Sequence, residues 1–139
     1  MANFNSVTYL KIHVNKYLGL PTDRGGLPFY LPFTHTITTE VAADTVNLVV
    51  LPAGCTVLDW TFSNDAMGAA TTMALGDAGS STRFYLATSV TAAGKASGSL
   101  TAGQNYTPTA DTIVLATFAG ATPTTTAVLK GYFLVILAA

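Results

Sequence analysis

The sequence predicts an all-β protein, a sandwich or barrel of short strands preceded by an extended N-terminal arm. Short segments rich in Thr, Val, Ile, Tyr and Phe recur from Thr34 onward, and these residue types fit a pleated sheet. Gly, Pro and Asp separate the segments at near-regular intervals, which is typical of sandwiches and barrels. No stretch of about 12 residues aligns its apolar side chains on one face of a helix.

The predicted arm comprises residues 1–33 and differs from the rest in its content of proline and basic residues. Within it, residues 8–14 alternate between apolar and polar side chains, which predicts a short strand. Residues 27–33 contain two prolines. Because proline lacks an N–H donor and holds the preceding residue extended, we expect neither regular strand nor helix there.

Large apolar side chains in the arm need a surface to cover them, since nothing local can bury them. Either the body of the domain or a neighbouring subunit would serve, and aromatic side chains are common anchors at interfaces. As the working hypothesis, seven residues of the arm form inter-subunit contacts: Leu10, Ile12, Tyr17, Phe29, Tyr30, Leu31 and Phe33.

The sandwich domain is predicted over residues 34–139. Its predicted strands are 34–40, 45–51, 56–63, 71–75, 82–88, 111–118 and 125–137. Asp44 and Asp111 each precede a Thr and an apolar strand. This repeated Asp-Thr motif indicates one of two arrangements. Either the two sites share a turn chemistry in which Asp accepts hydrogen bonds from the loop, or the two strands are equivalent in two halves of the sandwich.

Composition limits the classes of function. Charged residues make up 9% of the chain, against about 25% in an ordinary soluble domain. There are 23 Thr, 21 Ala and 12 Gly among 139 residues, so the surface must be largely uncharged. Such a surface favours coverage by partners or by further copies. A net charge of −1 without a basic run disfavours nucleic-acid binding, and no segment is typical of a leader or membrane span.

No group of residues has the spacing of a catalytic or metal site, so we expect no catalytic residue, cofactor or metal. Cys55 opens an apolar strand and is predicted to fill the core. His13 and His35 lack neighbouring ligands and are predicted to have structural or interface roles. Asp77 is predicted to accept hydrogen bonds in a turn, and Asp59 is expected on an exposed or interface face.

Residues 83–85, Arg-Phe-Tyr, combine a cation with aromatic rings and could stack on a sugar or base. The alternation of the segment indicates a simpler arrangement, with Phe84 in the core and Tyr85 at the surface.

The order of turns and strands resembles a known family. Asp44 to Asp59 contains a strand, a Leu-Pro-Ala-Gly turn and a Val-Leu-Asp strand, and a Thr-rich strand ends in Leu75-Gly76-Asp77. Ala110 to Ile113 and the strand from Lys130 also match. This pattern resembles the capsid decoration, or cement, proteins of tailed bacteriophages, such as the jelly-roll cement protein of short-tailed Bordetella phages. The resemblance covers roughly residues 34–139.

The resemblance implies a jelly-roll-like antiparallel β-sandwich. It also implies a non-enzymatic structural protein of the virion, made in the cytoplasm of the host bacterium. It would form a dimer or trimer and bind the major capsid protein on the outer surface of the head, without direct contact to nucleic acid or membrane. Two alternatives remain open. One is a tail or adaptor component, and the other is a lectin-like module that binds host glycans through exposed Trp60, Tyr85 or Tyr106.

Overall fold

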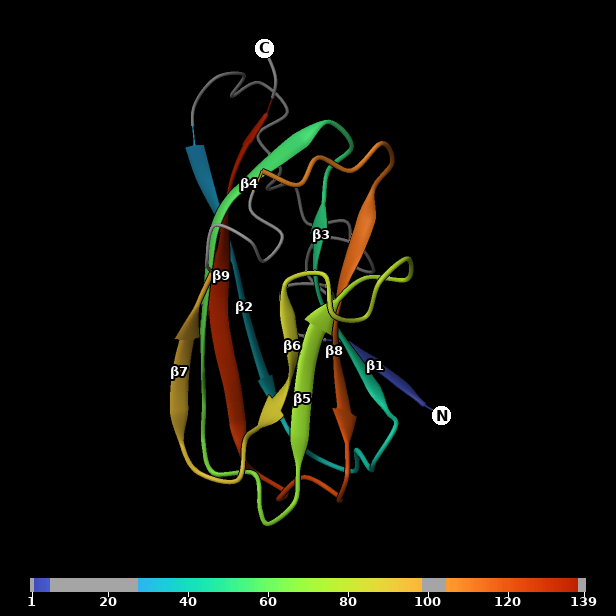
Figure 1. Cartoon of the computed structure of the whole chain (residues 1–139), viewed down its shortest axis with the longest axis vertical. Helices are drawn as coiled ribbons and strands as arrows, with labels where there is room; N and C mark the ends of the chain where they lie inside the picture. The colour runs from blue at the N-terminus through green and yellow to red at the C-terminus, as the bar shows by residue number, and fades with distance from the viewer. Residues whose placement is uncertain (1, 6–27, 99–104, 138–139) are drawn as a thin grey trace.

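The protein is built from two β-sheets packed face to face (Figure 1). A computed structural model describes residues 2–5, 28–98 and 105–137. These residues form nine strands and no helix, so the predicted all-β sandwich is confirmed. Within these ranges, no helix is long and apolar enough to cross a membrane.

One sheet has five strands in the order β1-β3-β8-β5-β6. Its strands are β1 (Asn3–Asn5), β3 (Thr45–Leu51), β5 (Thr72–Gly76), β6 (Tyr85–Ser89) and β8 (Thr112–Ala119). All neighbours are antiparallel except β1, which runs parallel to β3. Non-consecutive strands therefore lie side by side, as in a jelly roll.

The other sheet has four strands in the order β2-β9-β4-β7. They are β2 (Pro28–Thr36), β4 (Cys55–Asn64), β7 (Gly94–Ser97) and β9 (Val128–Leu137), all antiparallel to their neighbours. The long strand β9 lies between β2 and β4. Both β9 and β4 are therefore paired on each side, while β2 and β7 form the edges.

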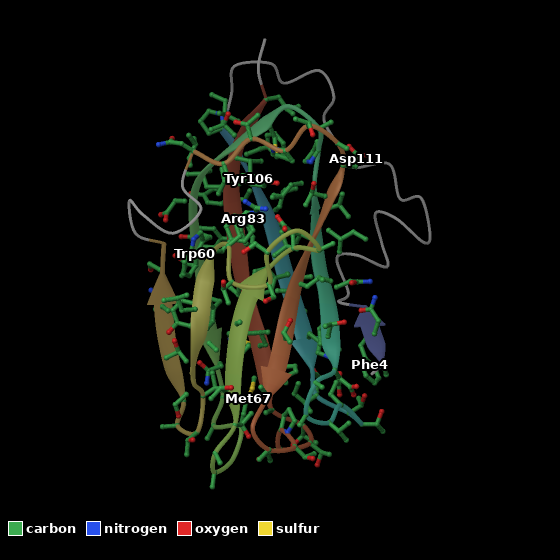
Figure 2. All side chains as sticks on the ribbon, turned by 45° about the vertical axis from the view of Figure 1, so that its right-hand side comes forward. Phe4, Trp60, Met67, Arg83, Tyr106 and Asp111 are labelled. Atoms are coloured by element: carbon green, nitrogen blue, oxygen red, sulfur yellow. The ribbon has the colours of Figure 1, made fainter. Side chains whose placement is uncertain are left out.

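The core lies between the sheets and is rich in aromatic side chains. Trp60 stacks on Phe62, with ring centroids 5.9 Å apart, and the label of Trp60 marks this layer in Figure 2. Phe133 of β9 meets Phe84 edge-on at 5.1 Å. Because offset and edge-on contacts suit aromatic rings, these residues join the four-stranded sheet to the segment preceding β6.

The predicted strands agree with the structure to different degrees. The prediction for residues 45–51 is confirmed without change as β3. Two strands of the described residues were not predicted: β1, which has three residues, and β7 (Gly94–Ser97), which lies between the predicted strands 82–88 and 111–118. The sequence around β7 contains glycine and does not predict a strand, because the strand conformation of β7 comes from its pairing with β4. The predicted strand over residues 8–14 lies outside the described residues.

The expectation that residues 27–33 contain no regular strand is wrong for residues 28–33. They belong to β2, which pairs with β9 without interruption from Pro28 to Thr36. The strand therefore begins six residues before the expected start of the sandwich at Thr34. Proline is tolerated here because β2 is an edge strand, where alternate N–H groups have no partner in the sheet.

The predicted turn role is confirmed for Asp44, whereas Asp111 accepts a hydrogen bond from a different loop, the one that follows β3. Asp44 Oδ2 accepts a hydrogen bond from Val41 N at 2.9 Å, and Asp111 Oδ1 accepts one from Ala53 N at 2.9 Å. The strands that follow, β3 and β8, are antiparallel neighbours in the same sheet. The repeated Asp-Thr motif thus supports two adjacent strands at opposite ends of the sandwich.

Candidate protein-interaction surface

The structure separates the predicted interface residues into two groups. Phe29, Leu31 and Phe33 point between the sheets and are 6%, 4% and 3% exposed. They are covered by the body of their own domain, one of the two possibilities that the sequence left open. Tyr30 points the other way and is 61% exposed. The remaining three predicted residues, Leu10, Ile12 and Tyr17, lie outside the described residues.

The outer face of the four-stranded sheet is apolar along much of β9 and β2. In β9, Leu129, Phe133 and Val135 are buried in the core, while Tyr132, Leu134 and Ile136 alternate with them on the outside and are half-buried. An antiparallel strand with one solvated face normally alternates apolar with polar residues, whereas strands covered on both faces are apolar throughout. The sequence of β9 is therefore that of a strand covered on both sides.

Residues of β2 extend this apolar face. Tyr30 pairs in register with Leu134, and Pro32 with Tyr132. The rings of Tyr30 and Tyr132 meet edge-on with centroids 4.9 Å apart. We call the outward side chains of β2, β9, β4 and β7 the outer sheet face. Aromatic and aliphatic side chains grouped on an exposed surface mark an interaction site.

The edge of β2 is poorly suited to bind a further strand. Ile37 N donates to Ala127 O, and Thr126 N donates to Ile37 O, so odd-numbered residues direct their backbone groups toward β9. Even-numbered residues therefore direct theirs to the open edge, where Pro28 and Pro32 provide no donor. Prolines on an edge oppose strand addition. A partner is accordingly expected to contact the outer sheet face rather than this edge.

Neither a metal cluster nor a reactive thiol is found among the residues that the structure describes. The described residues contain no cluster of His, Cys, Asp and Glu able to hold a metal ion. Cys55 is fully buried, as predicted, and its burial raises the pKa of the thiol to about 11. The reactive form of cysteine is the thiolate. Cys55 therefore lacks both the access and the ionisation that a nucleophile needs.

Arg83 and Tyr106, both labelled in Figure 2, form a cation–aromatic contact away from the outer sheet face. The guanidinium carbon of Arg83 is 4.2 Å from the ring centre of Tyr106, and Arg83 Nε donates to Asp77 Oδ2 at 2.5 Å. Asp77 also accepts from Gly79 N and Ser80 N, so its predicted role in the turn is confirmed. The cluster fixes the segment before β6.

The arrangement of aromatic residues does not favour glycan binding. Phe84 is in the core as predicted, and Trp60 is only 1% exposed. Tyr85, which was expected at the surface, is half-buried with its ring against Trp60 and Phe62. One face of the Tyr106 ring is occupied by Arg83. A stacking platform for a sugar needs an open ring, and these three residues do not provide one.

A buried hydrogen bond between His35 and Glu40, next to β2, was not predicted from the sequence. His35 Nε2 donates to Glu40 Oε1, and Thr38 N and Thr39 N donate to Glu40 Oε2 at 2.6 and 3.0 Å. Glu40 is 1% exposed and holds the loop between β2 and β3. Burial by itself would raise the pKa of Glu40, but the hydrogen bonds from His35 and Thr38 outweigh it and hold the pKa below its usual range.

The free energy of unfolding should therefore depend on the charge of Glu40. Because the pKa is lowered in the folded state, the stabilisation is complete above the unfolded-state value of 4.5 and is lost as the pH falls through the folded-state pKa. Glu40→Gln should lower the free energy of unfolding by about 1–3 kcal/mol near pH 7. Urea denaturation at a series of pH values measures this difference, which should shrink in acid.

The matched control is Asp111→Asn, which also neutralises one carboxylate but at an exposed loop position. It should have a much smaller effect near pH 7. A difference between wild type and Glu40→Gln that stays constant down to acidic pH would contradict the role assigned to the Glu40 carboxylate.

The chain is similar in structure to chains of known phage capsids. No family model matches the sequence, and no curated protein matches it significantly. A chain in the capsid of Ralstonia phage GP4 is similar in structure, with a TM-score of 0.78 and 14% identity over 99% of both chains. A chain in the acid-stable capsid of Helicobacter pylori bacteriophage KHP30 covers 81% of this chain and 93% of its own length, with a TM-score of 0.55 and 19% identity.

A third similar chain shares sequence as well as fold. It belongs to the capsid asymmetric unit of cyanophage Pam1, is 30% identical and has a TM-score of 0.57. The match covers 78% of this chain and 81% of that one. The first two similarities establish the fold, and this one adds a relationship in sequence. The chain therefore belongs to the phage capsid-related proteins and is a structural protein of a phage virion.

Proposed function

We propose that this chain is a decoration, or cement, protein that binds the outer surface of an icosahedral phage head and stabilises the contacts between capsid subunits. The observation that carries the proposal is the presence of a chain of this fold in phage capsids, at 30% identity in one of them. The turn and strand motifs that resemble cement proteins support the decoration role over other virion roles. No enzymatic activity is part of the proposal.

The surface of the protein fits this role. A protein added to a shell strengthens it when it binds several subunits at once, because the second contact then forms at a high effective concentration. Apolar and uncharged groups on the outer sheet face can make contacts that depend little on salt. The partners are the major capsid protein and further copies of this chain, and neither nucleic acid nor membrane is contacted.

The arm remains part of the proposal. We infer that Leu10, Ile12 and Tyr17, together with the exposed Tyr30, contribute to contacts with other chains. Phe29, Leu31 and Phe33 support those contacts only indirectly, because they hold β2 in the sandwich.

Co-sedimentation of the purified chain with undecorated heads tests the function. The expected result is saturable binding at a fixed number of copies that is a simple multiple of the icosahedral symmetry. The variant Leu10→Ser/Ile12→Ser/Tyr17→Ser should bind heads at least tenfold more weakly while its melting temperature stays unchanged. Gly94→Ala is the control, since an added Cβ there meets only an ordinary contact.

Three outcomes would contradict the decoration role. Failure to pellet with heads would remove it. Heads that do not form without this chain would make it a shell protein, and labelled chain located on the tail would make it a tail or adaptor component.

A further inference from the structure

The charges on the outer sheet face form an ordered pattern. Lys130 and Lys95 both pair in register with Ser63, so the two lysines lie in one row on either side of it. Asp59 lies on the same strand as Ser63, four positions earlier, and pairs with Leu134. In residues 28–98 and 105–137, the ionisable side chains within salt-bridge distance of one another are His35 with Glu40 and Arg83 with Asp77. The three charges on the face are therefore not paired with each other.

The row between these charges is uncharged and contains an aromatic side chain. It consists of Pro32, Tyr132, Thr61 and Ser97, which are consecutive partners across the four strands. Thr61 Oγ1 and Ser97 Oγ lie 3.1 Å apart on this face. Successive rows on one face of a sheet are about 7 Å apart. The lysine row and the Asp59 row thus lie at equal distances on either side of the Tyr132 row.

The pattern becomes complementary to itself when a second chain faces the first across a two-fold axis that runs along the Tyr132 row. This axis lies between the two facing sheets. It places the Asp59 row of each chain opposite the lysine row of the other. Asp59 of one chain then faces Ser63 of the other, between the two lysines. Packed sheets are about 10 Å apart and about 30° from parallel, so side chains near the axis keep these partners.

The alternative two-fold axis, parallel to the strands, gives an unfavourable arrangement. It leaves each row facing the same row of the other chain, so that lysines oppose lysines. Like charges placed opposite each other cost free energy, while opposite charges fix the register of an interface. The charge pattern therefore selects the axis that crosses the strands.

Size and composition also suit a second copy. A four-stranded face is about 19 Å wide and, for nine residues, about 30 Å long. A standard interface takes about 800 Å² of accessible surface from each partner, and such a corrugated face approaches that area. The Tyr30–Tyr132 pair covers the half of the face that β2 and β9 form. Aromatic side chains are enriched at protein interfaces.

We propose that two copies of this chain pack their outer sheet faces together about a two-fold axis that runs along the Tyr132 row, so that Asp59 of each chain lies between Lys95 and Lys130 of the other. The inference deepens the oligomeric part of the proposed function, on which it rests, and specifies a dimer.

Paired charge reversals test this arrangement in the full-length chain. Asp59→Lys makes the three charges of the face positive, and Lys95→Asp/Lys130→Asp makes them negative. Each variant alone should dissociate at least tenfold more readily than the wild-type dimer. A mixture of the two should form a 1:1 complex, because each face then opposes its complement. Sedimentation velocity measures the species, and circular dichroism melting checks that each variant is folded.

Asp111→Lys is the matched control, since it makes the same charge change in a loop beside the other sheet. It should leave the dimer intact. A wild-type monomer or trimer would overturn the proposal, as would two dissociated variants that fail to combine.

Co-sedimentation with heads distinguishes a failure of the proposed dimer from a failure of the proposed decoration role. A dimer that behaves as described but does not pellet with heads would refute the decoration role alone. A wild-type monomer that pellets with heads, and loses binding on Asp59→Lys, would assign the face to the capsid protein and refute the dimer alone.

Discussion

Replacing Gly131 by Ala is expected to unfold the protein or to lower its free energy of unfolding by more than about 3 kcal/mol. Gly131 lies in the central strand β9, between Phe33 of β2 and Phe62 of β4. A Cβ at this position would be 2.1 Å from Thr61 O and 2.7 Å from the Cα of Phe62. Both are backbone atoms in paired strands, so the clash cannot be relieved by a rotamer change. Chemical denaturation measures the loss.

The comparison variant is Gly94→Ala, which adds the same methyl group to edge strand β7. The nearest atom to that Cβ is Asn64 Oδ1 at 3.6 Å, an ordinary contact. Its stability should stay within about 0.5 kcal/mol of wild type. Equal effects of the two substitutions would show that β9 can shift, and would contradict the close packing around Gly131.

Truncating Phe133 to Ala should cost about 3–5 kcal/mol, the usual range for a fully buried aromatic side chain. Phe133 has no exposed surface. Its ring contacts Phe84 at 5.1 Å and Phe33 at 6.2 Å between centroids. The substitution removes contacts between the two sheets and leaves a cavity that the surrounding strands can fill only in part.

Tyr132→Ser provides the neighbouring control on the opposite side of β9. Its ring packs on Tyr30 at the surface, so the fold should lose about 1 kcal/mol or less. If the proposed dimer forms, this variant should weaken association much more than it weakens the fold. Unfolding at low protein concentration and sedimentation at high concentration separate the two effects. A loss of stability as large as that of Phe133→Ala would contradict the assigned orientation of the strand.

The main features of the fold follow from local sequence. Alternation of apolar and polar residues placed most of the strands, and Asp and Gly residues placed the turns between them. The turn roles of Asp44 and Asp77 were also predictable, since each accepts hydrogen bonds from backbone N–H groups two or three positions away. The physical cause of these features lies within a few residues in the chain. Asp111 differs, because its partner, Ala53 N, is 58 positions away.

The candidate surface was predictable only in part. The sequence indicated that the apolar residues around Pro28 and Pro32 require cover, but it did not decide which side chains enter the core. Pairing of β2 with β9 placed Phe29, Leu31 and Phe33 inside and Tyr30 outside. The contribution of β9 was missed because a strand that is apolar on both faces looks the same whether a core or a partner covers it.

Composition and periodicity were enough to predict an all-β sandwich with few charged residues. They carry that information because each residue type expresses it locally. The tertiary structure was needed to show that residues 28–33 belong to the sheet, that His35 meets Glu40, and that Asp59, Lys95 and Lys130 share one face. These relations depend on the register between strands far apart in the chain, which no local pattern specifies.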